Sequence, residues 1–131
     1  MMAGKHIEGI DFSRQALMLE QATATVHKMI QQLHAMEALE KIKELNGRLA
    51  EKLFDSAEQY VKLGYHRSAG YYFDFVIQQY HDSPFAEPAY VGKIRSLITR
   101  RRFDEAREEI SKFLERYPET SLRGEVEGLR P

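Results

Sequence analysis

The chain has 131 residues and a formal net charge of −1, with 43% hydrophobic and 30% charged residues. This length is enough for one domain with its own core, and the near-zero net charge gives no general attraction to nucleic acid. The absence of cysteine excludes disulfides, thiolate metal sites and a cysteine nucleophile.

The N-terminal segment is predicted to be a flexible arm. Residues 1–12 contain Gly4, Gly9 and scattered charges, with no apolar run that would form a signal peptide. Ser13 is predicted to cap a long helical stretch, because its hydroxyl can accept a bond from a backbone N–H of the first turn. No segment is long and apolar enough for a membrane span.

The long helical stretch has an unusual apolar pattern. From Ile30 to Leu45 apolar residues recur every three positions, and each step falls about 60° short of a full helical turn. The stripe therefore winds around the helix, and one neighbour cannot bury it. We expect either a break, near His34–Ala35 or at Asn46–Gly47, or several neighbours, including a second copy that pairs through residues 26–53.

Shorter elements follow this stretch. Gly64 is expected to take a positive φ in the turn after the long helix. Pro84 and Pro118 mark two further turns, since proline prevents a helix from continuing. The predicted helices run to about residue 63, then over 67–80, 85–99 and 103–117, with a short closing helix within 121–129.

These shorter elements repeat with an offset of 37 residues. Ala69 falls on Ala106, Phe73 on Ile110, Val76 on Phe113, Ile77 on Leu114 and Tyr80 on Tyr117. A two-helix period of this size is typical of an α-solenoid. The pattern predicts an all-α, tetratricopeptide-like solenoid in a single helical domain, 13–131, with repeat units at about 48–84 and 85–121. Ala57, Ala69 and Ala106 are expected at helix crossings, facing inward.

A family resemblance rests on several of these motifs. The residues that carry it are Arg48-Leu49-Ala50-Glu51, Ala57-Glu58-Gln59-Tyr60, Gly64, Ala69, Phe73 to Tyr80, the turn His81-Asp82-Ser83-Pro84, and Ala86-Glu87. This set resembles the C-terminal half of BamD-type lipoproteins, tetratricopeptide-like subunits of the bacterial outer-membrane β-barrel assembly machinery. The match covers about residues 35–129, whereas 1–34 do not match the repeats that normally precede it.

The resemblance implies a non-enzymatic scaffold on the periplasmic side of the outer membrane. In that family the C-terminal repeats dock on the periplasmic domains of the barrel subunit, and a lipidated N-terminal cysteine provides the anchor. This chain contains neither that cysteine nor an export signal, so membrane attachment is expected only through an anchor absent from it. The chain departs from the family at Tyr71-Tyr72-Phe73, where relatives often carry Asn-Arg-Phe, and at His81, where proline is usual.

Two groups of residues are candidates for partner binding, Tyr71 with Tyr72 and the loop Arg100, Arg101, Arg102. Tyrosine buries a large area with few torsions, and arginine forms bidentate bonds with carboxylates. The alternative is an ordinary surface tyrosine pair and a solvated basic helix end. Nucleic acid is not an expected partner, because the acidic run Asp104 to Glu109 follows and would repel phosphates.

The sequence carries no signature of catalysis or of a cofactor. His27 and His34 are seven residues apart, whereas metal ligands on a helix are usually three or four apart. It contains no glycine-rich phosphate loop or nucleophile elbow. We therefore expect no catalytic residue, cofactor or metal. Two alternatives remain beside the barrel-assembly scaffold: a tetratricopeptide adaptor for another complex, and a self-associating helical protein.

Overall fold

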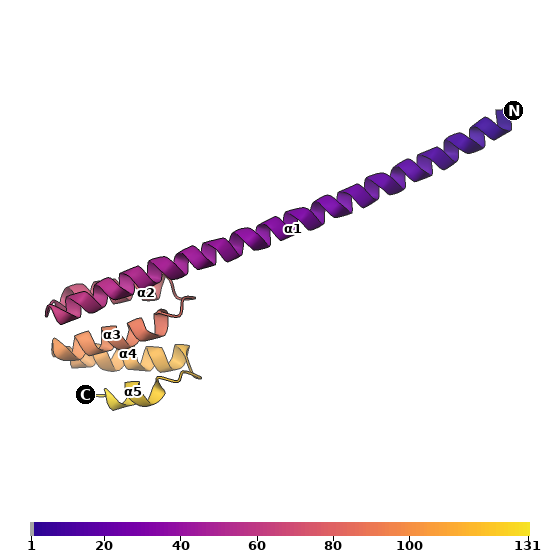
Figure 1. Cartoon of the computed structure of the whole chain (residues 1–131). Helices are drawn as coiled ribbons and strands as arrows, with labels where there is room; N and C mark the ends of the chain where they lie inside the picture. Colours follow the sequence, from indigo (N-terminus) through magenta and orange to yellow (C-terminus); the bar gives the residue numbers. More distant parts are fainter. Residues whose placement is uncertain (1) are drawn as a thin grey trace. The chain divides into compact units, whose positions relative to one another are not determined.

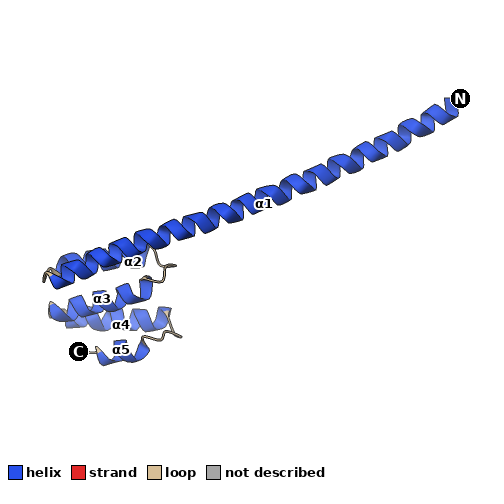
Figure 2. Cartoon of the chain, in the orientation of Figure 1, coloured by secondary structure: helices blue, strands red, loops and turns tan. Residues whose placement is uncertain are grey.

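The computed structural model describes the backbone of residues 2–131 and the side chains of residues 13–131. Its helices are α1 (Met2–Lys62), α2 (His66–Gln79), α3 (Ala86–Thr99), α4 (Phe103–Arg116) and α5 (Arg123–Gly128), shown in Figures 1 and 2. These described residues contain no strand. The predicted all-helical class is therefore confirmed. The chain divides into two units, 1–42 and 43–131.

The first unit is helical from Met2 onwards. Ser13 lies inside α1, so its prediction as an N-cap was wrong. The flexible arm predicted for residues 1–12 stays a prediction: the backbone from Met2 belongs to α1, and the side chains of these residues lie outside the described residues. A glycine within a helix costs only about 1 kcal/mol relative to alanine, and α1 contains no proline to stop it.

Neither of the two predicted breaks in the long helix is present. Helix α1 runs through both His34–Ala35 and Asn46–Gly47. Around the second position an i,i+4 ion pair, Arg48 Nη2 to Glu44 Oε1 at 2.8 Å, spans Gly47. The residues on either side of Gly47 favour helix, and their local interactions outweigh the weak tendency of one glycine to end it.

The core of the second unit is built from the last part of α1 and from α2 to α5. Helix α2 packs on α3, α3 on α4, and α4 on α5. The largest fully buried side chains are Ile77, Val76, Ile94, Ile110, Phe113 and Val126. Ala57, Ala69 and Ala106 are fully buried, as predicted. Small side chains at these positions let neighbouring backbones approach closely.

The two turns that begin α2 and α4 have the same backbone geometry. Gly64 has a φ of 82°, which confirms the prediction, and Arg101, 37 residues later, has a φ of 60°. The N–H of Tyr65 donates to the carbonyl of Tyr60 at 2.9 Å, and the N–H of Arg102 donates to that of Leu97 at 2.8 Å. The 37-residue offset seen in the sequence thus recurs in the backbone of the two turns.

The turns that follow α2 and α4 also correspond. The N–H of Ser83 donates to the carbonyl of Tyr80 at 3.0 Å, and the N–H of Thr120 donates to that of Tyr117 at 3.2 Å. Each hydroxyl then accepts a bond from the backbone N–H two residues later, Ser83 Oγ at 3.3 Å and Thr120 Oγ1 at 3.1 Å. A hydroxyl residue at this position closes both turns by the same local bond.

Candidate functional site

Three of the five predicted partner-binding residues lie in one surface groove. Tyr71, Arg100 and Arg102 line a groove of about 320 Å³ formed by α2, α3 and the start of α4, which we call the α2/α3/α4 groove. Tyr71 is 66% exposed there. The other two predicted residues, Tyr72 and Arg101, are not part of its lining.

Tyr72 lies against the core instead. Its ring stacks on Tyr60 with centroids 5.2 Å apart and an interplanar angle of 24°, and it is only partly exposed. A hydrogen bond with Tyr72, with smaller contributions from charge repulsion and burial, raises the pKa of Tyr60. Tyr72 therefore helps to hold α2 against the end of α1.

The α2/α3/α4 groove contains both paired and unpaired cations. Lys93 Nζ lies 2.8 Å from Asp74 Oδ1 and 3.3 Å from Glu109 Oε1. Burial lowers the pKa of Lys93, but its bonds to these two carboxylates outweigh that effect and raise the pKa overall. Arg102 pairs with Glu105 at 2.7 Å.

The remaining two cations of this groove are Arg67 and Arg100. Neither forms an ion pair with any residue whose side chain the structure describes. Both guanidinium groups are thus available to a carboxylate from outside the chain.

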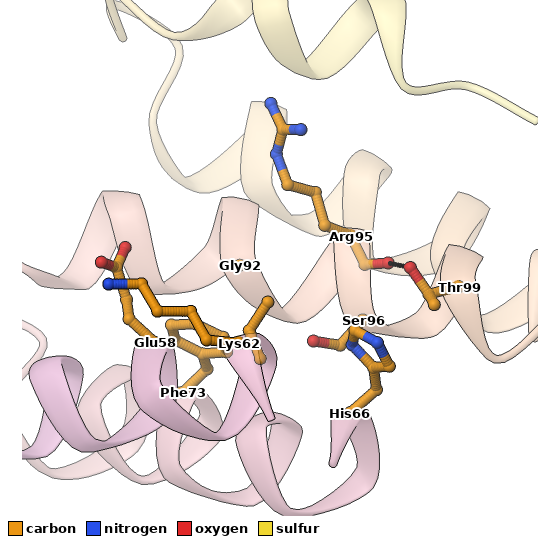
Figure 3. Close-up of a pocket in the computed structure, with 9 residues that line it drawn as sticks. Glu58, Lys62, His66, Phe73, Gly92, Arg95, Ser96 and Thr99 are labelled. Carbon is orange, nitrogen blue, oxygen red and sulfur yellow. Dashed lines mark hydrogen bonds between the residues drawn. The ribbon is translucent and has the colours of Figure 1, made fainter. Parts of the chain in front are cut away.

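A second concavity lies between the end of α1 and α3. Two neighbouring pockets of about 280 and 310 Å³ share Glu58, Phe73, Gly92 and Arg95 in their linings, and we call the two together the α1/α3 groove. Figure 3 shows the first of these pockets. The other one extends the groove to Leu122 and Glu125 of the C-terminal segment.

Close contact between two helices forms the floor of the α1/α3 groove. A Cβ atom added to Gly92 would lie 2.4 Å from Cζ of Phe73, which is far inside van der Waals contact. The Phe73 ring is itself fixed, being 2% exposed and packed edge-on against Phe54 at 5.7 Å. Glycine is therefore required on α3 where the ring of α2 touches it.

Two buried polar atoms at the α1/α3 groove lack partners. His66 Nδ1 and Ser96 Oγ are both buried, and neither forms a hydrogen bond with the described residues. Both side chains line the pocket drawn in Figure 3. A buried polar group without a partner costs about 1–3 kcal/mol. No sequence pattern indicates this pair, because it depends on how the start of α2 packs against α3.

The walls of the α1/α3 groove carry both signs of charge. Glu58 and Lys62 are exposed on α1, and Arg95 Nη2 bonds to Glu125 Oε1 at 2.6 Å. The groove therefore combines charges of both signs, an apolar floor and two unpaired polar atoms.

The residues described here include no group of three or more His, Asp or Glu side chains that could hold a metal ion. Within the same part of the chain, no helix has the length and apolar character needed to cross a membrane.

In comparisons with known proteins, no protein-family model and no curated protein matches this chain.

Proposed function

We propose that this chain is a protein-binding adaptor built from tetratricopeptide-like hairpins. The end of α1 with α2 forms one hairpin, α3 with α4 forms the next, and α5 begins a third. Support comes from the turn geometry that repeats after 37 residues and from the alanines buried at the crossings, Ala57, Ala69 and Ala106. Proteins of this architecture offer an extended surface rather than a catalytic pocket.

The partner segment binds in the α1/α3 groove. The observation that carries this assignment is the pair of buried atoms without partners, His66 Nδ1 and Ser96 Oγ. Both atoms are buried, so the His66 and Ser96 side chains turn toward the pocket when an extended segment binds, and its amide groups then satisfy them. One apolar side chain of the segment packs above Phe73 and Gly92, which line the pocket. Glu58 and Lys62 then select the charge of the flanking residues.

The α2/α3/α4 groove is a second candidate surface. Arg67 and Arg100 have no ion pair within the described part of the chain, and the exposed Tyr71 lines the same groove. A carboxylate side chain of a partner would bond to one guanidinium while Tyr71 packs on its aliphatic portion.

The resemblance to BamD-type lipoproteins supports a narrower form of the proposal. In that form the partner is the periplasmic region of the barrel subunit, and the chain acts at the periplasmic face of the bacterial outer membrane. The support consists of sequence motifs, the run Arg48 to Glu51, the Tyr60–Gly64–Ala69 spacing and the turn 81–84. An adaptor for another complex remains the alternative.

Binding of purified periplasmic domains of the barrel subunit tests the narrower form, and Ser96→Ala tests the groove. The substitution removes an unpartnered buried hydroxyl, so the fold should keep or gain stability while binding weakens about tenfold, the value of roughly one hydrogen bond. Ser56→Ala is the matched control, since Ser56 Oγ bonds within α1 to the Lys52 carbonyl and lies outside both grooves.

The outcomes separate the possibilities. Loss of binding in Arg100→Glu but not in Ser96→Ala would move the site to the α2/α3/α4 groove. Binding to other envelope proteins, but not to the barrel subunit, would retain the adaptor and reject the narrower form. If the partner still binds both variants with unchanged affinity, neither groove is the binding site.

A further inference from the structure

The first unit carries an exposed apolar seam with heptad spacing. Leu19, Ala22, Val26, Met29, Leu33 and Met36 follow one another at intervals of three and four residues, and all are exposed. With about 100° per residue, these six side chains and the adjacent Met18 and Ile30 fall within a stripe about 120° wide. This spacing is typical of the contact face of a coiled coil.

The apolar residues spaced by three from Ile30 to Leu45 overlap this seam in sequence but do not all belong to it. Leu39 and Ile42 continue the steps of three, but they lie on another side of the helix from Val26 and Leu33. Glu37 and Glu40 occupy the seam positions beyond Met36 and end it. The seam is thus a defined surface within residues 18–36, and a single partner helix can cover it.

We propose that this seam pairs with the same seam of a second copy of the chain, in antiparallel orientation. In the register centred between His27 and Lys28, each seam residue faces another seam residue. The facing pairs are Leu19 with Met36, Ala22 with Leu33, and Val26 with Met29, each formed twice by symmetry.

Packing favours this orientation. In the antiparallel register the small Ala22 lies opposite the large Leu33, so each layer holds one smaller and one larger side chain. In a parallel pair Ala22 would face Ala22 and leave a gap, whereas Leu33 would face Leu33. Thr25 also lies beside Gln32 of the second copy in the antiparallel register.

Charge favours the same orientation. Arg14 precedes the seam, and Glu37 and Glu40 follow it. In the antiparallel register Arg14 of one copy lies at the height of Lys41 of the other and one residue from Glu40, so charges of both signs meet at each end of the seam. A parallel pair would place Arg14, Glu37 and Glu40 beside their own copies, where like charges repel.

The charge balance also argues for a second copy as the occupant. Residues 13–42 contain three basic and three acidic residues. This neutral helix is not repelled by its own copy, and it has no excess of cations for anionic lipid.

The exposed area is near what a stable pair needs. The seven larger side chains of the stripe are between 42% and 68% exposed. Covering them removes on the order of 600 Å² from water in each copy, and a stable interface of standard size buries about 800 Å² per partner.

Sedimentation equilibrium of the full chain over a wide concentration range tests the pairing. We expect a dimer that dissociates on dilution, and a monomer for Val26→Glu at concentrations where the unmodified chain is dimeric. Gln31→Glu is the matched control, because it adds the same charge on the opposite side of the helix. A chain that stays monomeric at all concentrations, or a Val26→Glu variant that still dimerises, would overturn the proposal.

Cross-linking tests the orientation, and the natural absence of cysteine leaves no background. A mixture of Ala22→Cys and Leu33→Cys chains should form a disulfide between the two variants. Ala22→Cys alone should not, since its two copies lie about 16 Å apart along the antiparallel pair. Efficient self-cross-linking of Ala22→Cys would show a parallel pair and refute the antiparallel one.

Binding of the monomeric chain to phosphatidylglycerol vesicles, in place of self-association, would assign the seam to a lipid surface and overturn the proposal. The test of self-association with Val26→Glu does not depend on the proposed function, because Val26 lies outside both grooves. Val26→Glu should therefore bind protein partners as the unmodified chain does.

Discussion

Individual residues at the start of α2 and α4 adopt a left-handed backbone conformation. Gly64 has a φ of 82°, and Arg101 has a φ of 60° at the corresponding position. A side chain in this region costs about 1–2 kcal/mol because its Cβ crowds the neighbouring carbonyl, whereas glycine avoids the clash. The second turn is therefore strained where the first is not.

Arg101→Gly should stabilise the protein and Gly64→Ala should destabilise it, each by about 1 kcal/mol. Space does not limit either change, since a Cβ at Gly64 would meet nothing within 4 Å. Chemical denaturation of the two variants measures both effects. Gly70→Ala is the control, because Gly70 is helical and equally open, so alanine should be neutral or stabilising there. Equal effects at 64 and 70 would contradict the conformational explanation.

The pKa of Lys93 is set by burial and by two carboxylates. Although burial lowers its pKa, the bonds to Asp74 and Glu109 raise it above the ordinary lysine value. A raised pKa in the folded state means that Lys93 stabilises the fold at all pH values below the unfolded lysine pKa of about 10.4. That contribution is lost as the pH rises through the folded pKa.

Lys93→Arg should remove part of this alkaline loss of stability. Arginine stays charged throughout the range in which lysine loses its proton, so the free energy of unfolding should fall less steeply above about pH 10 in the variant. Denaturant titrations at a series of pH values make the comparison. The tyrosines ionise in both proteins and cancel in the difference. Parallel curves for the two proteins would show that the charge of Lys93 does not stabilise the fold.

At the scale of elements, α2 and α3 are held together by a close contact that only glycine allows. The Phe73 ring lies where a Cβ of residue 92 would be, with ring atoms 2.4 to 2.7 Å from it. Since Phe73 is also packed against Phe54, the ring cannot move aside without disturbing the end of α1. The same contact forms the floor of the α1/α3 groove.

Gly92→Ala should destabilise the protein by about 1–3 kcal/mol through overpacking. In a Phe73→Leu background the same substitution should cost clearly less, because the shorter side chain leaves room for the methyl group. A double-mutant cycle of thermal or chemical denaturation measures this coupling. Additive effects of the two substitutions would show that the ring contact does not limit residue 92.

At the scale of the whole molecule, the chain consists of two units with different character. The core residues all fall between Ala50 and Leu129, within the second unit. In the first unit, the apolar side chains described from Leu17 to Ile42 are exposed. The second unit thus contains the packing that stabilises the fold, and the first contains a surface suited to association.

A fragment of residues 43–131 should fold alone. Its thermal midpoint should lie within about 5 °C of that of the full chain, a shift that corresponds to roughly 1 kcal/mol for a domain of this size. Thermal unfolding followed by circular dichroism provides the measurement, at concentrations low enough for the full chain to be monomeric. A broad, non-cooperative transition of the fragment would show that the first unit is needed for the core.

Much of the fold could be predicted from local sequence. The apolar spacing and the turn residues gave the helices of the second unit to within about two residues, and the repeat between Ala69 and Ala106 predicted which small residues are buried. The positive φ of Gly64 followed from its place in a turn. Each of these features depends on neighbouring residues in the chain, so the sequence contains the necessary information.

The structure alone decided the properties that depend on neighbours in space. It showed α1 to be continuous, placed Tyr72 against Tyr60, and brought Tyr71 together with Arg100 and Arg102. It also left His66 Nδ1 and Ser96 Oγ buried without partners. Residue types and intervals determine where helices form. Which side chains meet, and which polar atoms remain unsatisfied, is set by the packing of one helix against another.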